Sequence, residues 1–466
     1  MKRKIFVVLL VSLFFLVSSI SMGIKVEEEK LVNNIQNSEE FCPVMKLDLK
    51  TAEKWEKEYN NAKFAYIDPN LKEEIMATTT YSILDLLEYT PSERNQGRCS
   101  NCWAWPSTAV LAMALNLQEG IKDRLSVQFM NTCGAEYTFG MNTIECCEGG
   151  TLDMFASFYR STNFAIPWSN TMAHWHDGVT FNCKTDCSEI SKTPNYPIYE
   201  IEAENIPTRN IPTEDAIENI KNVLHQEKGV YFSVFFADQT DISNFQNFWR
   251  EEDEDYVYDL DYYCGNDWNS DEAAGHAMLV YGYHDEEGTE NDYWMVLNSW
   301  GINDNRPKGL LKWDMHINYN CQYSNQYAFA ARTLDVSFDP DPEAPEFPTI
   351  NGPSSVKIDK EYTFEVSAND PQKDEVYIYV KWDSGFGGSG WLGPVASGES
   401  IEVSHTWDEK DNYVLRARAK DTENNIGPWT SHSITMPKSK SNRILSYDFL
   451  KQFPIISRLL EKMFAF

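Results

Sequence analysis

A run of acidic residues and prolines, Asp339-Pro340-Asp341-Pro342-Glu343-Ala344-Pro345, divides this chain into two parts with different patterns. Proline fixes its own φ angle and favours an extended backbone, which is typical of a linker between domains. All 10 cysteines lie before the run, whereas the hydrophobic residues after it mostly recur with a period of two. We therefore expect separate folding units on either side of a linker over residues 336–345.

Beyond the linker, apolar or aromatic side chains mostly alternate with polar ones at residues 362–366, 376–380 and 413–419, and turn-rich segments lie between them. Such alternation indicates β-strands with one buried face. Residues 346–437 are therefore predicted to form a small, all-β sandwich.

The chain begins with Met1-Lys2-Arg3-Lys4, followed by an apolar stretch over residues 5–17 and then small polar residues. This pattern predicts a secretory signal peptide over residues 1–23. A membrane anchor is the alternative, but the apolar stretch is shorter than the ~20 residues that span a bilayer. Residues 24–78 are charged, with a predicted helix near 51–63, and are expected to be a removable prosegment or, alternatively, a plain folded extension.

The charge balance limits the partners of the chain. It has 40 basic and 71 acidic residues, a formal charge of -31. General nucleic-acid binding depends on positive charge, so we expect no nucleic-acid partner. Exported chains use most of their cysteines in disulfides, and the same is expected here.

One cysteine, Cys102, lies in a context that suits a nucleophile. Residues 104–115 have a helical pattern, which would place the Cys102 sulfur at a helix N-terminus, where partial positive charge stabilises a thiolate. Pro106 is tolerated because an N–H in the first helical turn has no intrahelical partner to lose. The alternatives are a disulfide, with Cys99 or another cysteine, and a redox Cys-x-x-Cys motif.

Three further residues suit a cysteine hydrolase site. Gln96 can donate a side-chain N–H to a developing oxyanion, and the backbone N–H of Cys102 can supply a second donor. Downstream, His276 lies in Gly275-His276-Ala277 and Asn298 begins Asn298-Ser299-Trp300-Gly301. An imidazole can hold the thiolate as an ion pair and then protonate the leaving amine. Taken alone, a histidine in such a run is more often a packed strand residue.

In these motifs the chain resembles papain-like cysteine peptidases. Besides the downstream His276 and Asn298 motifs, the matching positions are Asp85-Leu86, Thr90-Pro91, Gln96, Gly97, Cys99, Cys102, Trp103, Ala104, Trp105, Leu125-Ser126-x-Gln128, Cys133 and Cys147-Glu148-Gly149-Gly150. The resemblance covers residues 79–335. It implies an α+β domain of two lobes, one helical and one like a β-barrel.

The resemblance also implies roles for individual residues. Cys102 would attack the scissile carbonyl, Asn298 would fix the tautomer of His276, and Trp300 would cover the bond between them. The implied substrate-binding residues are Gly149, Gly150, Leu152, Ala274 and Ala277, with Trp103 and Trp300 as supporting residues. Gly150 would bond the substrate backbone. Leu152, Ala274 and Ala277 would line one pocket beside the cleft, which would favour an apolar substrate side chain.

The chain departs from the family pattern in three places. Ser100 and Asn101 replace the usual Gly and then Ser or Ala between the two cysteines. His276 and Asn298 lie farther from Cys102 than the family's ~130–150 residues, which indicates insertions. The family's second Trp is missing from residues 302–305, so the shielding of His276 from water is not explained by the sequence.

The same resemblance implies disulfide pairings. It favours Cys99 with Cys147 and Cys264 with Cys321. Cys133 and Cys146 would pair with Cys183 and Cys187 in an order that the sequence leaves open. With Cys102 as the nucleophile, Cys42 is the odd cysteine, within the expected prosegment.

The predicted sandwich resembles polycystic-kidney-disease-type or immunoglobulin-like modules. The residues that carry this resemblance are Asp370-Pro371, Lys381-Trp382-Asp383, Val403-Ser404-His405-Thr406-Trp407 and Lys420-Asp421. Its acidic turns are expected to be solvated rather than to bind Ca²⁺. Residues 438–466 form a predicted tail in which basic residues precede apolar ones, which suits a surface-lying amphipathic segment or a segment docked on the protein.

These observations predict a secreted cysteine endopeptidase with a Cys-His-Asn site and a thioester acyl-enzyme. The alternative is a catalytically weak or inactive papain-like protein that acts in cell-surface binding or adhesion. We expect a monomer without cofactor or metal, with a peptide or protein as substrate and a cell-surface or polymer ligand for the C-terminal module. Its expected location is extracellular, with the tail as a means of retention at the cell surface.

Overall fold

The structure of the chain is a computed structural model, and it divides into two compact units, Met1–Asp341 and Pro342–Phe466. It describes residues 42–138, 143–180, 183–269, 271–286, 292–323, 326–338, 342–382, 388–408 and 413–436. The predicted signal peptide, residues 24–41 of the expected prosegment, and the tail over 438–466 lie outside the described residues.

The first lobe of the first unit is built from the helices α4 (Ala104–Glu119), α5 (Val127–Tyr137) and α6 (Leu152–Thr162). Helix α4 is buried along most of its length and ends at Gly120, whose φ of 66° suits a glycine. Side-chain oxygens cap the other two helices, because Ser126 accepts from the Phe129 N–H and Thr151 from the Met154 N–H.

The second lobe is a largely antiparallel sheet. Its main strands, in spatial order, are β5 (Glu200–Asn205), β13 (Phe329–Ser337), β6 (Val230–Phe236), β8 (Ala274–His284), β9 (Tyr293–Leu297), β10 (Leu310–Asp314) and β7 (Val257–Tyr258). Only β10 and β7 pair in parallel among these neighbours. The central strand β8 is buried over almost its whole length and packs against α4, so it brings the two lobes together.

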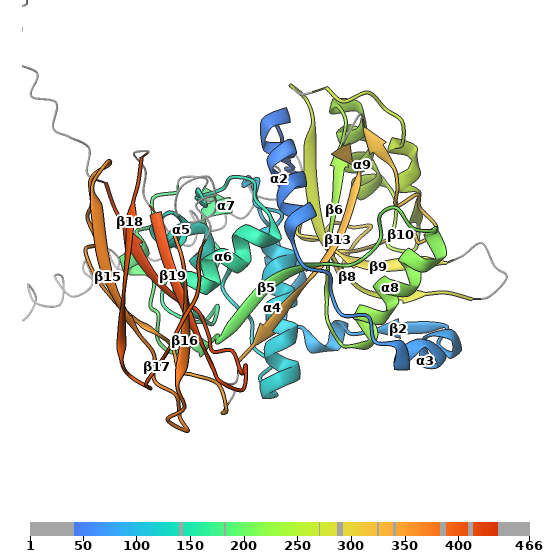
Figure 1. Cartoon of the computed structure of the whole chain (residues 1–466). Helices are drawn as coiled ribbons and strands as arrows, with labels where there is room; N and C mark the ends of the chain where they lie inside the picture. Colours follow the sequence, from blue (N-terminus) through green and yellow to red (C-terminus); the bar gives the residue numbers. More distant parts are fainter. Residues whose placement is uncertain are drawn as a thin grey trace, which may run out of the picture. The chain divides into compact units, whose positions relative to one another are not determined.

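Residues 42–82 fold onto both lobes. They form β1 (Met45–Lys46), α2 (Leu49–Asn61), α3 (Lys72–Ala77) and β2 (Thr80–Ser82), and both short strands pair with β8. Helix α2 lies between the helical lobe and the sheet (Figure 1). Asp48 caps it by accepting from the Thr51 N–H. This segment therefore lies at the junction of the two lobes.

The second unit is a sandwich of two antiparallel sheets, as the period-two pattern predicted. One sheet contains β14 (Thr349–Asn351), β15 (Glu361–Ser367) and β18 (Ser400–Thr406). The other contains β17 (Gly388–Val395), β16 (Val376–Lys381), β19 (Tyr413–Asp421) and β20 (Thr430–Ile434). Alternate residues of β16 are buried, and Phe364 and Trp407 are fully buried in the core between the sheets.

The predicted α+β class is confirmed, and two predicted helices correspond to α2 and α4. Strand β13 continues to Ser337, two residues into the predicted linker. Within the described residues, no helix combines the length and apolar character needed to cross a bilayer.

Candidate active site

Cys102 lies just before α4 and is fully buried, with its sulfur outside every disulfide of the described residues. The four disulfides are Cys99–Cys147, Cys133–Cys187, Cys146–Cys183 and Cys264–Cys321. The pairing of Cys99 with Cys147 leaves Cys102 as a thiol instead of half of a Cys-x-x-Cys bridge. The sulfurs of Cys146, Cys147 and Cys183 lie within 4.8 Å of one another, but cysteines in disulfides do not supply thiolate ligands.

His276 and Asn298 are brought together by neighbouring strands. His276 lies in β8, and Asn298 follows the end of β9. Nε2 of His276 is 2.8 Å from Oδ1 of Asn298, which also accepts the Ser299 N–H. Nδ1 of His276 is buried and has no hydrogen-bond partner among the described residues. The amide can therefore hold the imidazole with Nδ1 available for another group.

Trp300 covers this pair. Its ring stacks on the His276 ring with centroids 4.3 Å apart. Trp249, from α9 (Gln239–Glu251), packs edge-on against Trp300 at 5.7 Å and is fully buried. The shielding that the missing second Trp left unexplained thus comes from another element, and sequence reasoning did not predict this role of Trp249.

Gln96 is held with its amide N–H groups directed away from Ser299. The Ser299 hydroxyl donates to Oε1 of Gln96 at 2.7 Å, which fixes Nε2 as the donor end. Nε2 donates to the Cys99 carbonyl at 2.7 Å and to the Pro43 carbonyl at 3.2 Å. The Pro43 carbonyl belongs to a segment of the chain that crosses the site.

We expect Gln96→Ala to lower kcat by about 10²-fold to 10³-fold, because it removes one donor to the oxyanion. Ser299→Ala should have a smaller effect in the same direction, since the amide remains but can rotate. Steady-state kinetics on one peptide measure both. Thr132→Ala, outside this hydrogen-bond network, is the control, and a Gln96→Ala enzyme with unchanged kcat would contradict the assignment.

Residues 42–47 cover the site. The Pro43 carbonyl accepts from Trp300 Nε1 at 3.1 Å as well as from Gln96. Met45 pairs with Gly275 in the sheet, and the Leu47 N–H donates to the Ala273 carbonyl at 3.1 Å. No motif in the sequence marks these residues, because their position depends on how the chain crosses the cleft.

This cover changes the ionisation expected from the sequence. Burial raises the pKa of the Cys102 thiol to about 12, although the backbone N–H groups of Ala277, Trp103 and Met45 act to lower it. Burial also lowers the pKa of His276 to about 4, against the opposing effect of its bond to Asn298. Both shifts favour the neutral forms, so burial in the covered form opposes the resting thiolate–imidazolium pair that the sequence predicts. The helix N-terminus contributes less than desolvation does.

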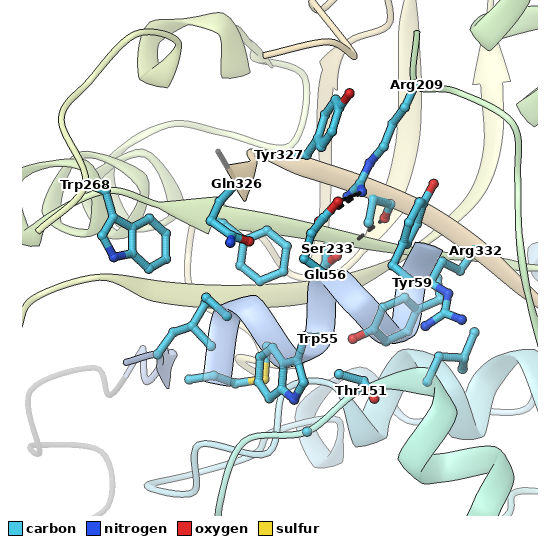
Figure 2. Close-up of a pocket in the computed structure, with 18 residues that line it drawn as sticks. Trp55, Glu56, Tyr59, Thr151, Arg209, Ser233, Trp268, Gln326, Tyr327 and Arg332 are labelled. Atoms are coloured by element: carbon cyan, nitrogen blue, oxygen red, sulfur yellow. Dashed lines mark hydrogen bonds and ion pairs between the residues drawn. The ribbon is translucent and has the colours of Figure 1, made fainter. Parts of the chain in front are cut away.

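A pocket opens beside the covered cleft, and Figure 2 shows its lining. Gly150 and Leu152 are part of the lining, whereas Ala274 and Ala277 are not. Ala274 pairs with Lys46 of β1, and Ala277 pairs with Ser233 of β6. The structure therefore brings only some of the predicted pocket residues to this pocket.

The two glycines are required for close packing. Neither Gly149 nor Gly150 has a positive φ, so an unusual turn conformation does not explain them. A Cβ on Gly150 would lie 2.5 Å from the ring of Trp103, and one on Gly149 would lie 3.2 Å from Cβ of Met45. Trp103 is fixed in turn by a 3.0 Å bond from its Nε1 to the Glu148 carbonyl. Gly149 thus allows a peptide chain to approach this wall of the cleft.

The thiol, the imidazole–amide pair and the Gln96 donor together define a site of the kind used by cysteine hydrolases. The model of the papain family of cysteine proteases matches residues 88–331, more than half of the chain. The chain therefore belongs to the papain family of cysteine proteases.

Curated relatives match only this part. Cysteine proteinase 2 of Zea mays is 27% identical over 225 residues, which are 48% of this chain and 52% of the relative. Cathepsin S of Rattus norvegicus is 26% identical over 209 residues, 44% of this chain and 52% of the relative. The chain thus spans about half the length of these relatives.

Two solved structures are similar to one fifth of this chain. The PKD domain of an M14-like peptidase from a Thermoplasmatales archaeon is 41% identical, with 97% of that chain covered and a TM-score of 0.20. The CARDB domain of a Pyrococcus furiosus protein is 18% identical, with 90% covered and a TM-score of 0.17.

Proposed function

We propose that this chain is a secreted cysteine endopeptidase, made as a latent precursor, that hydrolyses peptide bonds through Cys102, His276, Asn298 and Gln96. The observation that supports it most is the Pro43 carbonyl held by Gln96. A peptide carbonyl already occupies the donor that would stabilise an oxyanion, and the Met45 N–H of the same segment hydrogen-bonds to the Cys102 sulfur.

The chemistry follows from the groups present. With the cleft open to substrate, the Cys102 proton passes to His276, and the thiolate attacks the scissile carbonyl carbon. Gln96 Nε2–H and the Cys102 N–H stabilise the oxyanion, and the imidazolium protonates the leaving amine as the C–N bond breaks. Water then attacks the thioester with His276 as the base, which releases the acid and restores the thiol. Asn298 keeps the imidazole oriented throughout.

In this proposal, residues 42–47 keep the precursor inactive because of the direction in which they run through the cleft. Pro43 lies at Gln96, whereas Leu47, later in the chain, lines the pocket together with Leu152. By resemblance, that pocket receives a substrate residue that precedes the cleaved bond. The segment therefore runs through the cleft in the opposite chain direction to a substrate. This direction supports its role as a removable prosegment that is not itself cleaved at the site.

Secretion is supported by the four disulfides and by the predicted signal peptide. The test of the whole proposal is the release of peptides from a denatured protein by the chain after limited proteolysis has removed residues 42–61. Release that depends on Cys102 supports an endopeptidase. No release, with the Cys102 thiol accessible, would favour the alternative of a papain-like binding protein.

The C-terminal sandwich adds a binding function to this proposal. The outer face of its four-stranded sheet carries Arg418, between Trp391 at 5.7 Å and Trp429 at 4.6 Å, and Lys420, 5.3 Å from Tyr377. Cations held over aromatic rings on one face of a strongly acidic chain suit a polysaccharide with carboxylate groups, which would pair with the cations. Retention at the cell surface by residues 438–466 remains a prediction.

Replacing both Arg418 and Lys420 with Gln in the full Cys102→Ala chain should weaken binding to polygalacturonate by about tenfold or more. Sedimentation with the polymer measures this. Lys373→Gln, an exposed cation outside this face, is the matched control. Equal binding by all the chains would contradict a role for this face.

A further inference from the structure

The pocket beside the cleft is filled from one side by the N-terminal segment. Helix α2 contributes Ala52, Trp55, Glu56 and Tyr59, and Met45 and Leu47 precede it in the lining. The rest of the wall comes from residues after Gly149. Figure 2 shows Glu56 reaching from α2 to Arg209 on the opposite wall. If the segment is removed, as the proposed function requires, this third of the lining leaves with it.

Arg209 is held by both the segment and the body of the enzyme. Its Nη1 donates to both carboxylate oxygens of Glu56, at 3.0 and 3.1 Å. Its Nε and Nη2 donate to the Phe329 carbonyl, at 3.3 and 3.0 Å. The guanidinium also lies 4.2 Å from the ring centroid of Tyr327 and 3.7 Å from that of Tyr59. The Phe329 and Tyr327 contacts are independent of the segment, so they can keep Arg209 in place.

Removal of Glu56 leaves Arg209 without a counter-charge in the pocket. In the covered chain, with Glu56 and Tyr59 packed against it, the side chain of Arg209 is 7% exposed. A guanidinium stays charged at all physiological pH values, so the vacated position favours another carboxylate. The second cation of the lining, Arg332, differs because it pairs with Asp153, which belongs to α6 and stays with the enzyme. Arg209 is therefore the cation that loses its partner.

The rest of the wall suits the stem of a side chain. Leu152, Phe235 and Ala330 are apolar and line the same pocket. A glutamate side chain places two methylenes before its carboxylate, which matches an apolar wall with a cation at its rim. In the covered chain, Glu56 is such a side chain: it lines the pocket and its carboxylate pairs with Arg209.

We propose that Arg209 is a specificity-determining residue that makes this pocket select an acidic side chain in the substrate, at a position before the cleaved bond. The inference rests on the proposed function and modifies the apolar preference expected from Leu152, Ala274 and Ala277. The net charge of -31 repels acidic peptides at long range, so a measured preference for glutamate must come from a local group.

The test uses the full chain, activated by limited proteolysis that removes residues 42–61, and peptide pairs that differ only in Glu against Gln at one of the positions before the cleaved bond. At the position that enters the pocket, kcat/KM should be at least about tenfold higher for Glu. Arg209→Gln should bring the ratio to about one, and Arg209→Lys should leave it between these values. Lys308→Gln, an exposed cation outside the pocket lining, should keep the wild-type ratio.

A wild-type ratio of one or less at every position would overturn the inference without any variant, so the test survives if Arg209→Gln does not fold. A ratio that Arg209→Gln leaves unchanged would also overturn it, while the proposed function stands because peptides are still cleaved. Failure of the wild-type chain to cleave any peptide would overturn the proposed function, and the inference with it.

Discussion

Replacing Cys102 with alanine should abolish peptide hydrolysis by the activated chain, lowering kcat/KM by at least about 10⁴-fold. In the proposed mechanism the thiol is the nucleophile, so no acyl-enzyme forms without it, and the oxyanion donors alone supply only a small part of the rate. Steady-state hydrolysis of one peptide by the two chains measures the loss.

Two controls separate chemistry from stability. Cys42→Ala removes the other thiol that lies outside the four disulfides, and it should leave the activity of the processed chain unchanged because Cys42 lies in the segment that processing removes. Cys102→Ala deletes one small buried group, which should cost at most about 1–2 kcal/mol of unfolding free energy. A Cys102→Ala chain that folds and keeps activity within tenfold of the wild type would refute the assigned nucleophile.

The second large effect is the pH dependence of Cys102 alkylation. In the covered chain, burial raises the pKa of the Cys102 thiol to about 12 and lowers the pKa of His276 to about 4. Only about 10⁻⁵ of the thiol is then ionised at pH 7, and the alkylation rate should rise about tenfold per pH unit up to the raised pKa. With residues 42–61 removed, solvent and the imidazolium stabilise the thiolate, so the rate should level off at a much lower pH.

Iodoacetamide kinetics between pH 5 and 9 compare the two forms. The signal is the mass of the peptide that contains Cys102, which separates it from Cys42. The difference between the forms should be largest at the acid end, because there the covered thiol is least ionised. Identical profiles would mean that the segment does not control the ionisation of Cys102.

The sequence predicted much of the fold because the relevant patterns are local. Alternation in residues 376–380 required a strand with one buried face, and β16 has it. The helical pattern after Cys102 corresponds to α4. The proline-rich run lies at the boundary between the two units, with Pro342 as the first residue of the second.

The features that the sequence did not predict depend on contacts between distant segments. Residues 42–47 carry no motif, and only the folded chain places the Pro43 carbonyl at Gln96. Trp249 lies on helix α9, far from His276 in the sequence. It contributes to the shielding of His276 by packing against Trp300, which stacks on the imidazole. The sequence also did not predict that burial raises the pKa of the Cys102 thiol, because the covering segment lies far from Cys102 in the sequence. The role of Arg209 could not be predicted from the sequence, because its partner, Glu56, lies 153 residues away along the chain.

The central claim is that the Cys102 sulfur becomes a nucleophile next to His276 when the cleft is open. The most direct measurement is to treat the activated chain with a peptide epoxide and to locate the adduct by mass spectrometry, in the wild type and in His276→Ala. The account predicts one adduct, on Cys102, which forms at least about 10²-fold more slowly in the variant. An adduct on another residue, or equal rates in the two chains, would contradict it.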